Sequence, residues 1–342
     1  MRADARSVVA LALSFSLSSC AVNLSSEGEP PQPARVVPQL SGCLPLADRA
    51  SAVTGRVSWV TLPDRSSLVV ADSATLGGET SSVGFANAAS DCLAQSEPLA
   101  TRPIIDITPV STTSRARPLG SLTITDTFLY FSADHADGLG SDGIGVARWD
   151  AASERFTAQA LLWTADRPSY GSAAALVGDE VYVFGGLDAR FLSADVYLAR
   201  VPSAQIADLS AYEYWQGGGN FGPDADLAQP LVEGGQSPSV AWSATEQRWL
   251  MLYATPLASE LTVRSGLDIS GPWSAPYTLG RCDLPSSDPG AFCGDSALVP
   301  ELAADGQIAL TQGVASFARP PAATDQDFWT RLVRVPWPSG LP

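Results

Sequence analysis

The sequence contains no lysine, a single histidine and no pair of cysteines separated by two residues. All 20 basic side chains are therefore arginines, and against 36 acidic side chains they leave a net charge of −16. Such an acidic surface disfavours nucleic acid and anionic lipid headgroups as partners. One histidine without paired cysteines also leaves little from which to build a zinc site, so the sequence predicts no bound zinc.

Helical periodicity and the common catalytic motifs are scarce as well. Few stretches keep an apolar helical period, and the best short one is residues 201–215, VPSAQIADLSAYEYW. No Gly-x-Ser-x-Gly nucleophile elbow, phosphate-binding loop or Rossmann glycine pattern occurs. The chain is instead rich in Val, Thr, Ser, Gly, Pro, Tyr and Trp, a composition that favours an all-β fold.

The beginning of the chain resembles a bacterial lipoprotein signal. Arg2 and Arg6 form a short positive segment, and residues 8–17 form an apolar segment too short to span a bilayer. Small residues then precede Cys20, so we expect a signal peptide over residues 1–19 and a lipid on the Cys20 thiol. An ordinary signal peptide followed by an incidental cysteine is the alternative.

Lipidation would place the protein at a membrane. Several acyl chains, at about 0.8 kcal/mol per buried methylene, would hold it there almost irreversibly. Residue 21 is Ala, not the Asp that keeps lipoproteins of enteric bacteria at the inner membrane, which favours an exported protein on the outer membrane. The anchor would face the periplasm or the cell surface. Residues 20–46 read as the lipidated cysteine and a Ser-, Pro- and Glu-rich tether.

The remaining four cysteines suggest disulfides. Without Cys20 an even number is left in an exported chain, which indicates two bridges in one of three connectivities. Proximity in the sequence favours Cys43 with Cys92 and Cys282 with Cys293. The second bridge closes a short loop and would stabilise the fold by about 3 kcal/mol.

The rest of the chain repeats one pattern, an apolar strand followed by a second apolar strand that carries an arginine. The four pairs are 127–134 with 145–150, 181–188 with 197–202, 249–256 with 261–266, and 308–314 with 331–337. Their arginines are Arg148, Arg200, Arg264 and Arg334. A fifth unit has the first strand, residues 67–74, without the arginine.

This repetition predicts a five-bladed β-propeller with four-stranded antiparallel blades over residues 47–338. The strand that begins each blade would line a central channel, and the arginine strand would be the third from the centre. Pairing of the two chain ends would close the ring and remove an exposed edge. A β-sandwich is the alternative for so many short strands.

The segment RSGLDISGPWS, residues 264–274, fits this scheme as the turn that leaves the third strand of the fourth blade. Pro272 prevents helix and fixes the turn, and Trp273 is too large to be left in water without cause. We expect Trp273 to cover the outer edge of the blade core. Stacking of Trp273 on a sugar is the alternative.

Three groups of segments carry a family resemblance. They are YLARVP with YEYW (197–202 and 212–215), WLMLY with VRSG and GPWS (249–253, 263–266 and 271–274), and RLVRVPW (331–337). They resemble a bacterial family of five-bladed propellers catalogued as domain of unknown function 4185, over about residues 47–338. More distantly they resemble arabinanase-type and invertase-type glycoside hydrolases.

The resemblance implies a glycan site at one mouth of the channel, where the hydrolases use acidic residues from separate blades. One carboxylic acid protonates the leaving oxygen, and a second carboxylate acts as base or nucleophile. The matching strands here are poor in acid, since Thr54–Arg56, Gly120, Tyr170–Ser172 and Gln236–Ser239 stand at these places. Only the fifth unit supplies one, Glu301.

Other carboxylates that could replace the missing acids are Asp72, in VVADSA, and Asp134, which ends a predicted strand. His135, the single histidine, follows Asp134 and could act as a general acid or base, although a surface role is the alternative. Asp137 and Asp142 continue a loop rich in Asp and Gly. Oxygen ligands of this kind could bind Ca²⁺, but the spacing is not that of an EF-hand, and a solvated acidic loop is the simpler interpretation.

Two functions remain. The anchor, the tether and the acid-poor channel favour a monomeric, noncatalytic propeller that binds a glycan or another envelope protein. The alternative is a glycoside hydrolase of an extracellular or cell-wall polysaccharide, with Asp72, Asp134 and Glu301 as displaced acids. Two carboxyl groups about 5–9.5 Å apart in one pocket would support hydrolysis.

Overall fold

The structure, a computed structural model, describes residues 47–48, 51–64, 67–76, 79–86, 104–135, 140–190, 193–255, 260–294, 296–316 and 330–342. They lie in one compact unit, Val37–Pro342. The expected signal peptide, the Cys20 lipidation site, most of the tether, and Cys43 and Cys92 lie outside the described residues. Within the part that the structure describes, no helix is long and apolar enough to cross a membrane.

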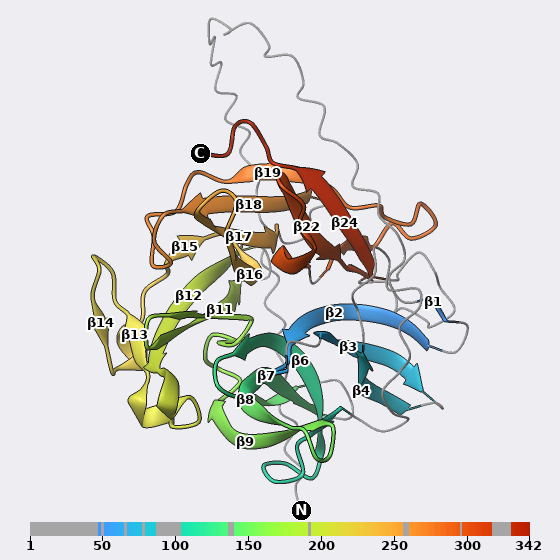
Figure 1. The fold of residues 1–342 in the computed structure, drawn as a ribbon, viewed down its shortest axis with the longest axis vertical. Helices are drawn as coiled ribbons and strands as arrows, with labels where there is room; N and C mark the ends of the chain where they lie inside the picture. Colours follow the sequence, from blue (N-terminus) through green and yellow to red (C-terminus); the bar gives the residue numbers. More distant parts are fainter. Residues whose placement is uncertain are drawn as a thin grey trace, which may run out of the picture. The chain divides into compact units, whose positions relative to one another are not determined.

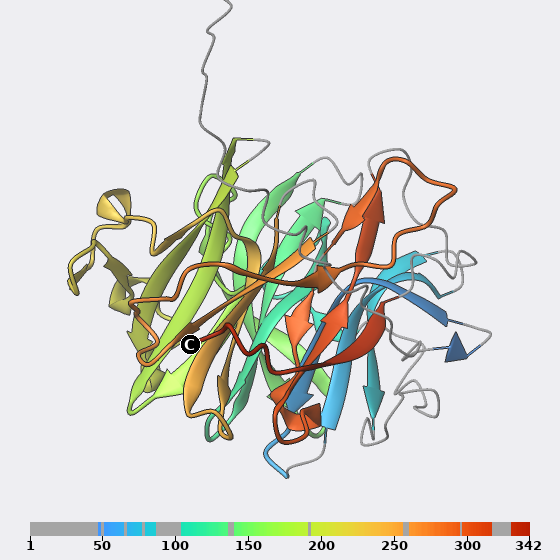
Figure 2. The ribbon, with the colours of Figure 1, turned by 90° about the horizontal axis from the view of Figure 1, so that it is seen from above.

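The fold is all-β, with short sheets in a propeller-like arrangement about a common centre (Figure 1). Figure 2 shows the green and teal sheets lying side by side with their strands similarly inclined. The helical elements of the described residues are four 3-10 segments of three residues each. They are η1 (Ser203–Gln205), η2 (Leu209–Ala211), η3 (Ala225–Leu227) and η4 (Pro300–Leu302).

The first two sheets are formed by β1 to β9. Sheet 1 has the order β1-β2-β3-β4 and sheet 2 has the order β5-β9-β8-β7-β6. The strands of sheet 1 are β1 (Ala47–Asp48), β2 (Ser51–Thr61), β3 (Ser67–Leu76) and β4 (Glu79–Ala86). Those of sheet 2 are β5 (Ile105–Asp106), β6 (Ser114–Thr123), β7 (Thr127–His135), β8 (Ser141–Asp150) and β9 (Arg155–Trp163).

Sheets 3 and 4 follow. Sheet 3 has the order β10-β11-β12-β13-β14, with β15 also paired to β12, and sheet 4 has the order β16-β17-β18-β19. The strands of sheet 3 are β10 (Ala173–Val177), β11 (Glu180–Arg190), β12 (Ser193–Pro202), β13 (Glu213–Trp215), β14 (Phe221–Gly222) and β15 (Val232–Glu233). Those of sheet 4 are β16 (Gln236–Ser243), β17 (Arg248–Ala254), β18 (Glu260–Gly266) and β19 (Tyr277–Arg281).

Sheet 5 is the smallest of the five, with the order β21-β22-β24, and β20 and β23 form a separate two-stranded ribbon. The strands are β20 (Ala291–Cys293), β21 (Ala297–Leu298), β22 (Gln307–Gln312), β23 (Val314–Ser316) and β24 (Arg331–Pro336). The expectation of four antiparallel strands in every blade is therefore wrong. Sheet 3 gains β13, β14 and β15 from the long connection to sheet 4, and β5 pairs parallel to β9.

The arginine pattern has a clear structural position. Arg148, Arg200, Arg264 and Arg334 all lie on the third strand from the centre of their sheets, as the repeat predicts. Their partners differ, since Arg200 pairs with Glu213 at 2.6 Å whereas the Arg264 Nε donates to the Tyr253 hydroxyl over 2.8 Å. The repeat therefore marks blade structure, not a shared binding site.

The core is a series of apolar layers, each between two successive sheets. Strand β7 shows how alternation builds them. Leu129 and Phe131 belong to the layer that contains Leu68 of sheet 1, whereas Tyr130, between them in sequence, belongs to the layer that contains Val183 of sheet 3. All five side chains are fully buried. A strand buried on both faces in this way reads as a continuous apolar run, which explains the sequence TFLYFSAD.

The first and last of the described sheets are neighbours in the ring. Among the described strands, none from one end of the chain pairs with a strand from the other, since sheet 1 holds β1–β4 and sheet 5 holds β21, β22 and β24. Strand β2 instead lies against β21 and β23, so the first and last sheets are neighbours without sharing a strand.

Trp273 has the structural role that the sequence suggests. Its backbone pairs with Gly266 at the end of β18, and its side chain packs on the apolar layer between sheets 3 and 4. The Ser274 N–H donates to the Ser265 carbonyl over 2.8 Å, which fixes the chain reversal.

Candidate functional site

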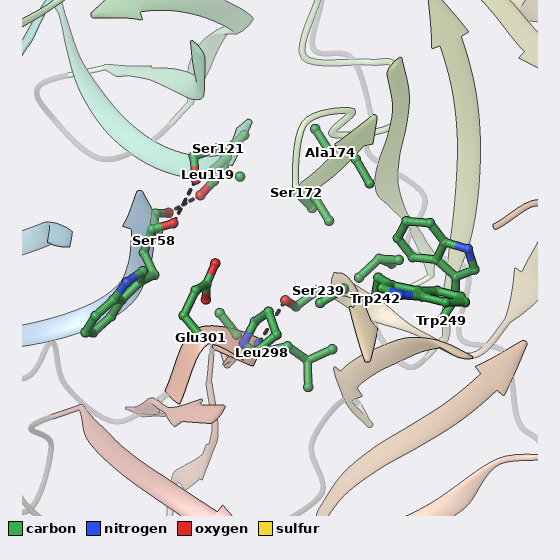
Figure 3. Close-up of a pocket in the computed structure, with 18 residues that line it drawn as sticks. Ser58, Leu119, Ser121, Ser172, Ala174, Ser239, Trp242, Trp249, Leu298 and Glu301 are labelled. Atoms are coloured by element: carbon green, nitrogen blue, oxygen red, sulfur yellow. Dashed lines mark hydrogen bonds between the residues drawn. The ribbon is translucent and has the colours of Figure 1, made fainter. Parts of the chain in front are cut away.

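A pocket of about 320 Å³ lies where the innermost strands of all five sheets converge (Figure 3). The strands β2, β6, β10, β16 and β21 each supply part of its wall, and η4 closes one side. Because residues from every sheet meet there, the pocket exists only when the whole ring is assembled.

The walls approach closely because small residues stand at the centre. The Gly120 N–H donates to the Gly171 carbonyl over 2.6 Å and joins β6 to the segment before β10. A Cβ on Gly120 would lie 2.8 Å from the Ala173 Cα. Gly171 has a φ of +101°, and a Cβ there would lie 2.5 Å from the Tyr130 Cβ. Gly120 therefore lets β6 approach β10, and Gly171 lets the segment before β10 approach β7.

The serine hydroxyls of the pocket are engaged in holding its walls. The Ser58 Oγ donates to the Leu119 carbonyl, and the Ser121 Oγ donates to the Trp59 carbonyl over 2.9 Å, so both bonds join β2 to β6. On the other side the Ser239 Oγ accepts from the Leu298 N–H and joins β16 to β21. None of these bonds runs to a general base, so they fit a structural role and not that of an activated nucleophile.

Glu301 is the only charged residue among the described residues that line this pocket. It follows Pro300 at the start of η4, and Figure 3 shows its side chain directed into the open centre, toward Ser58 and Leu119. The carboxylate is exposed to the pocket, but the surrounding walls displace much of its water. This desolvation raises the pKa of Glu301, and one backbone hydrogen bond opposes the shift.

Two tryptophans form one edge of the pocket. Trp242 of β16 and Trp249 of β17 are paired across the strands, with ring centroids 5.4 Å apart in an edge-to-face arrangement. The Trp242 side chain is 37% exposed, which is unusual for so large an apolar group. It also lines a neighbouring cavity of about 260 Å³. An exposed indole between two hollows can stack on the apolar face of a sugar ring.

Asp134 does not share this pocket with Glu301. It lines a second cavity, at the beginning of β6 and the end of β7. The Arg117 Nε donates to its Oδ2 over 2.8 Å, and the Ser132 Oγ donates to its Oδ1. Both oxygens are thus held by neighbouring side chains.

His135 pairs with Asp142, not with the adjacent Asp134. Its Nε2 lies 3.0 Å from the Asp142 Oδ1. Hydrogen bonds from Ser114, His135 and Ser111 hold the pKa of Asp142 below its ordinary value. This group is exposed at the surface, which fits the surface role that the sequence left open for His135.

The other predicted site residues lie partly or wholly outside the described part of the chain. Asp72 lies in β3, where its backbone pairs with Ser82, and its side chain is outside the described part. Asp137, in the loop considered for Ca²⁺, is outside the described residues. No group of three or more His, Cys, Asp or Glu side chains that could hold a metal ion occurs among the residues described.

Of the two predicted disulfides, the one that lies among the described residues is confirmed. Cys282 and Cys293 form a disulfide between the end of sheet 4 and β20, and both are buried. The two cysteines that it joins are 11 positions apart in the sequence.

Sequence reasoning missed Trp242 and Trp249 as pocket residues. They stand in the segments GGQSPSVAW and WLMLYATP, where alternation alone assigns large apolar residues to the core. The signal that could have identified them is position, because Trp242 lies near the end of an innermost strand and its turn.

Comparisons with known proteins fit this geometry. The model of the family described as domain of unknown function DUF4185 matches residues 129–311. No curated protein matches the sequence. Among solved structures, a candidate hydrolase from Bacteroides ovatus ATCC 8483 is similar, with 12% identity, a TM-score of 0.62, and coverage of 82% of this chain and 85% of that one.

Two groups of glycoside hydrolases share the fold. A GH43_1 enzyme from Xanthomonas citri complexed with xylotriose has 17% identity and a TM-score of 0.54, covering 87% of this chain and 90% of that one. The catalytic domain of a GH62 α-L-arabinofuranosidase from Coprinopsis cinerea has 10% identity and a TM-score of 0.52, covering 86% and 95%. At such identities the similarity concerns the fold.

Proposed function

The chain belongs to the DUF4185 family, and from this premise we propose that it binds a glycan in the central pocket without hydrolysing it. The observation that carries the proposal is the composition of that pocket. Its described lining is neutral except for Glu301, and it offers small residues, backbone groups and an exposed tryptophan at the edge. Aromatic stacking and neutral hydrogen bonds are what a sugar ring requires.

The same composition argues against hydrolysis. Cleavage of a glycosidic bond commonly uses two carboxyl groups on either side of it, about 5–9.5 Å apart. Among the described lining residues Glu301 has no carboxylate neighbour in the central pocket, and Asp134 lines a different cavity. Of the candidate acids whose side chains the structure describes, Glu301 and Asp134 therefore lie in separate sites.

The wider organisation forms part of the proposal. The five sheets of three or more strands would be the five blades of the propeller, over residues 47–338. The signal peptide over residues 1–19, the lipidated Cys20 and the tether to residue 46 would hold the monomeric propeller on the outer membrane. There it would meet periplasmic or cell-surface glycans.

The binding proposal is tested with the full-length chain in detergent. Arabinan, galactan, peptidoglycan fragments and lipopolysaccharide glycans are screened for binding and, in the same samples, for release of reducing ends. We expect saturable binding to at least one glycan, no release, and weaker binding by Trp242→Ala. Absence of both binding and release for every glycan tested would contradict the glycan proposal and would favour an envelope protein as the partner.

A glycoside hydrolase is the second candidate, and one observation favours it. Desolvation raises the pKa of Glu301, as a general acid for glycoside cleavage requires, and the similar solved structures include glycoside hydrolases. Release of reducing ends that disappears in Glu301→Gln, with glycan binding retained, would establish this function and overturn the noncatalytic one.

The anchor has its own test. Mass spectrometry of the N-terminal peptide from bacterial membranes should find acyl chains on Cys20. The variant Cys20→Ala should leave the membrane fraction. An unmodified Cys20 in a soluble mature protein would support the ordinary signal peptide instead.

A further inference from the structure

The second cavity, which we call the arginine pocket, has mainly basic side chains among its described charged residues, in contrast to the acidic chain. It has a volume of about 360 Å³, and its described lining includes Arg115, Arg117 and Arg167 and one acid, Asp134. The chain as a whole has a net charge of −16. Three guanidinium groups around one hollow of such a protein concentrate a positive potential there, because a concave low-dielectric surface focuses the field.

The arginine pocket is distinct from the central pocket. Both use β6, but Arg115 and Arg117 stand at its beginning whereas Leu119, Gly120 and Ser121 line the central pocket further along. No residue is shared between the two linings. A ligand of the arginine pocket would therefore be bound independently of a glycan at Glu301.

Asp134 serves this pocket as a support. It accepts from the Arg117 Nε and from the Ser132 Oγ through different oxygens, and its side chain is only 15% exposed. A largely buried carboxylate held at both oxygens fixes the direction of the guanidinium that it contacts. Pairing through Nε restricts the planar head group of Arg117, which lines the cavity.

Arg167 is positioned by a different acid. It belongs to the connection between β9 and β10, and its Nη1 donates to Asp226, in η3. The Asp226 side chain is 73% exposed and lies outside the cavity lining, so water screens much of its charge. The acid positions the Arg167 side chain and neutralises it only in part.

We propose that the arginine pocket binds a small ligand through an oxyanion group, which is either a carboxylate or a sulfate. Guanidinium groups donate paired N–H bonds that match the oxygens of such anions. The inference does not depend on the glycan proposal, because the two pockets have separate linings.

The test measures binding of two probes to the full-length protein by calorimetry, at constant ionic strength set with NaCl. The probes are D-glucuronate, which bears a carboxylate, and sodium sulfate, and D-glucose is the neutral control. We expect saturable binding of glucuronate, of sulfate or of both, and none of glucose. Glucuronate alone would identify a carboxylate ligand, and sulfate alone a sulfated one. Absence of saturable binding by both anions would overturn the proposal.

Variants separate a site from general electrostatics. Arg115→Gln and Arg167→Gln should each weaken anion binding about 10- to 100-fold, the effect of losing hydrogen bonds to a charged group. Arg281→Gln removes an arginine that pairs with Glu260 outside this cavity and should leave binding unchanged. Equal weakening by Arg281→Gln would overturn the proposal.

Two further variants test whether binding requires the paired donors of a guanidinium and whether the anion binds in the arginine pocket. Arg167→Lys keeps the charge but loses the paired donors, so it should bind more weakly than the native protein while retaining its thermal unfolding temperature. Glu301→Gln should leave anion binding unchanged. Loss of anion binding in Glu301→Gln would show that the anion binds in the central pocket and would overturn the assignment.

Discussion

The Leu298 N–H donates a hydrogen bond to the Ser239 Oγ over 2.9 Å. Both residues are buried and lie in the innermost strands of neighbouring sheets, 59 positions apart in sequence. The bond joins β16 to β21, and Leu298 is followed directly by the turn that carries Glu301. The position of the pocket carboxylate thus depends on a serine of the preceding sheet.

Ser239→Ala should destabilise the fold by about 1–3 kcal/mol, because it leaves a buried backbone N–H without its acceptor. Urea unfolding measures this change. The variant Ser210→Ala, at an exposed position of η2, provides the control and should change stability by less than about 0.5 kcal/mol. Equal effects of the two substitutions would contradict the role given to Ser239.

Trp242→Ala should weaken binding of the glycan identified by the screen about tenfold, since it removes the exposed ring at the pocket edge. Trp242→Phe should restore part of the affinity because an aromatic face remains. Leu227→Ala, which removes an exposed apolar side chain elsewhere, should have no effect. Unchanged affinity in Trp242→Ala would remove this tryptophan from the proposed site.

Glu301→Gln should become more stable relative to the native protein as the pH rises. Desolvation raises the pKa of Glu301 in the folded state above its ordinary value of 4.5, so the folded state binds more protons than the unfolded state between the two pKa values. The stabilising contribution is complete below the unfolded pKa and is lost as the pH rises through the folded one.

Thermal unfolding of the native protein and of Glu301→Gln from pH 4 to pH 8 measures this dependence. The difference between the two unfolding temperatures should grow in favour of the variant as Glu301 ionises. A constant difference over this range would mean that the pocket does not disfavour the charged carboxylate.

Gly171→Ala should lower stability by about 3 kcal/mol, because it combines a φ of +101° with a Cβ placed 2.5 Å from the Tyr130 Cβ. Gly178→Ala is a matched control, since Gly178 also has a positive φ, +61°, but open space around its Cβ position. Its cost should be about 1 kcal/mol. Chemical denaturation of both variants would separate steric contact from backbone strain.

Several features of the fold could be predicted from local sequence. The alternation in β7 places Leu129 and Phe131 on one face and Tyr130 on the other, and the chain needs no distant information to do so. The same holds for the arginines of the third strands and for the nearby pair Cys282 and Cys293. The number of strands per sheet was less predictable, because a short edge strand such as β14 has only two residues, too few to show an alternation of apolar and polar side chains.

The grouping of acidic residues was decided only by tertiary structure. Sequence order places Asp134 beside His135, but neighbouring side chains on a strand point to opposite faces, so Asp134 meets Arg117 and His135 meets Asp142. The placement of five sheets around the central pocket decides which carboxylate lines it. This placement brings Glu301 into the central pocket and leaves Asp134 in the arginine pocket. The sequence by itself determined the strands and their buried faces, because alternation is a local property. The sharing of a cavity required the assembled ring, because its walls come from strands far apart in the chain.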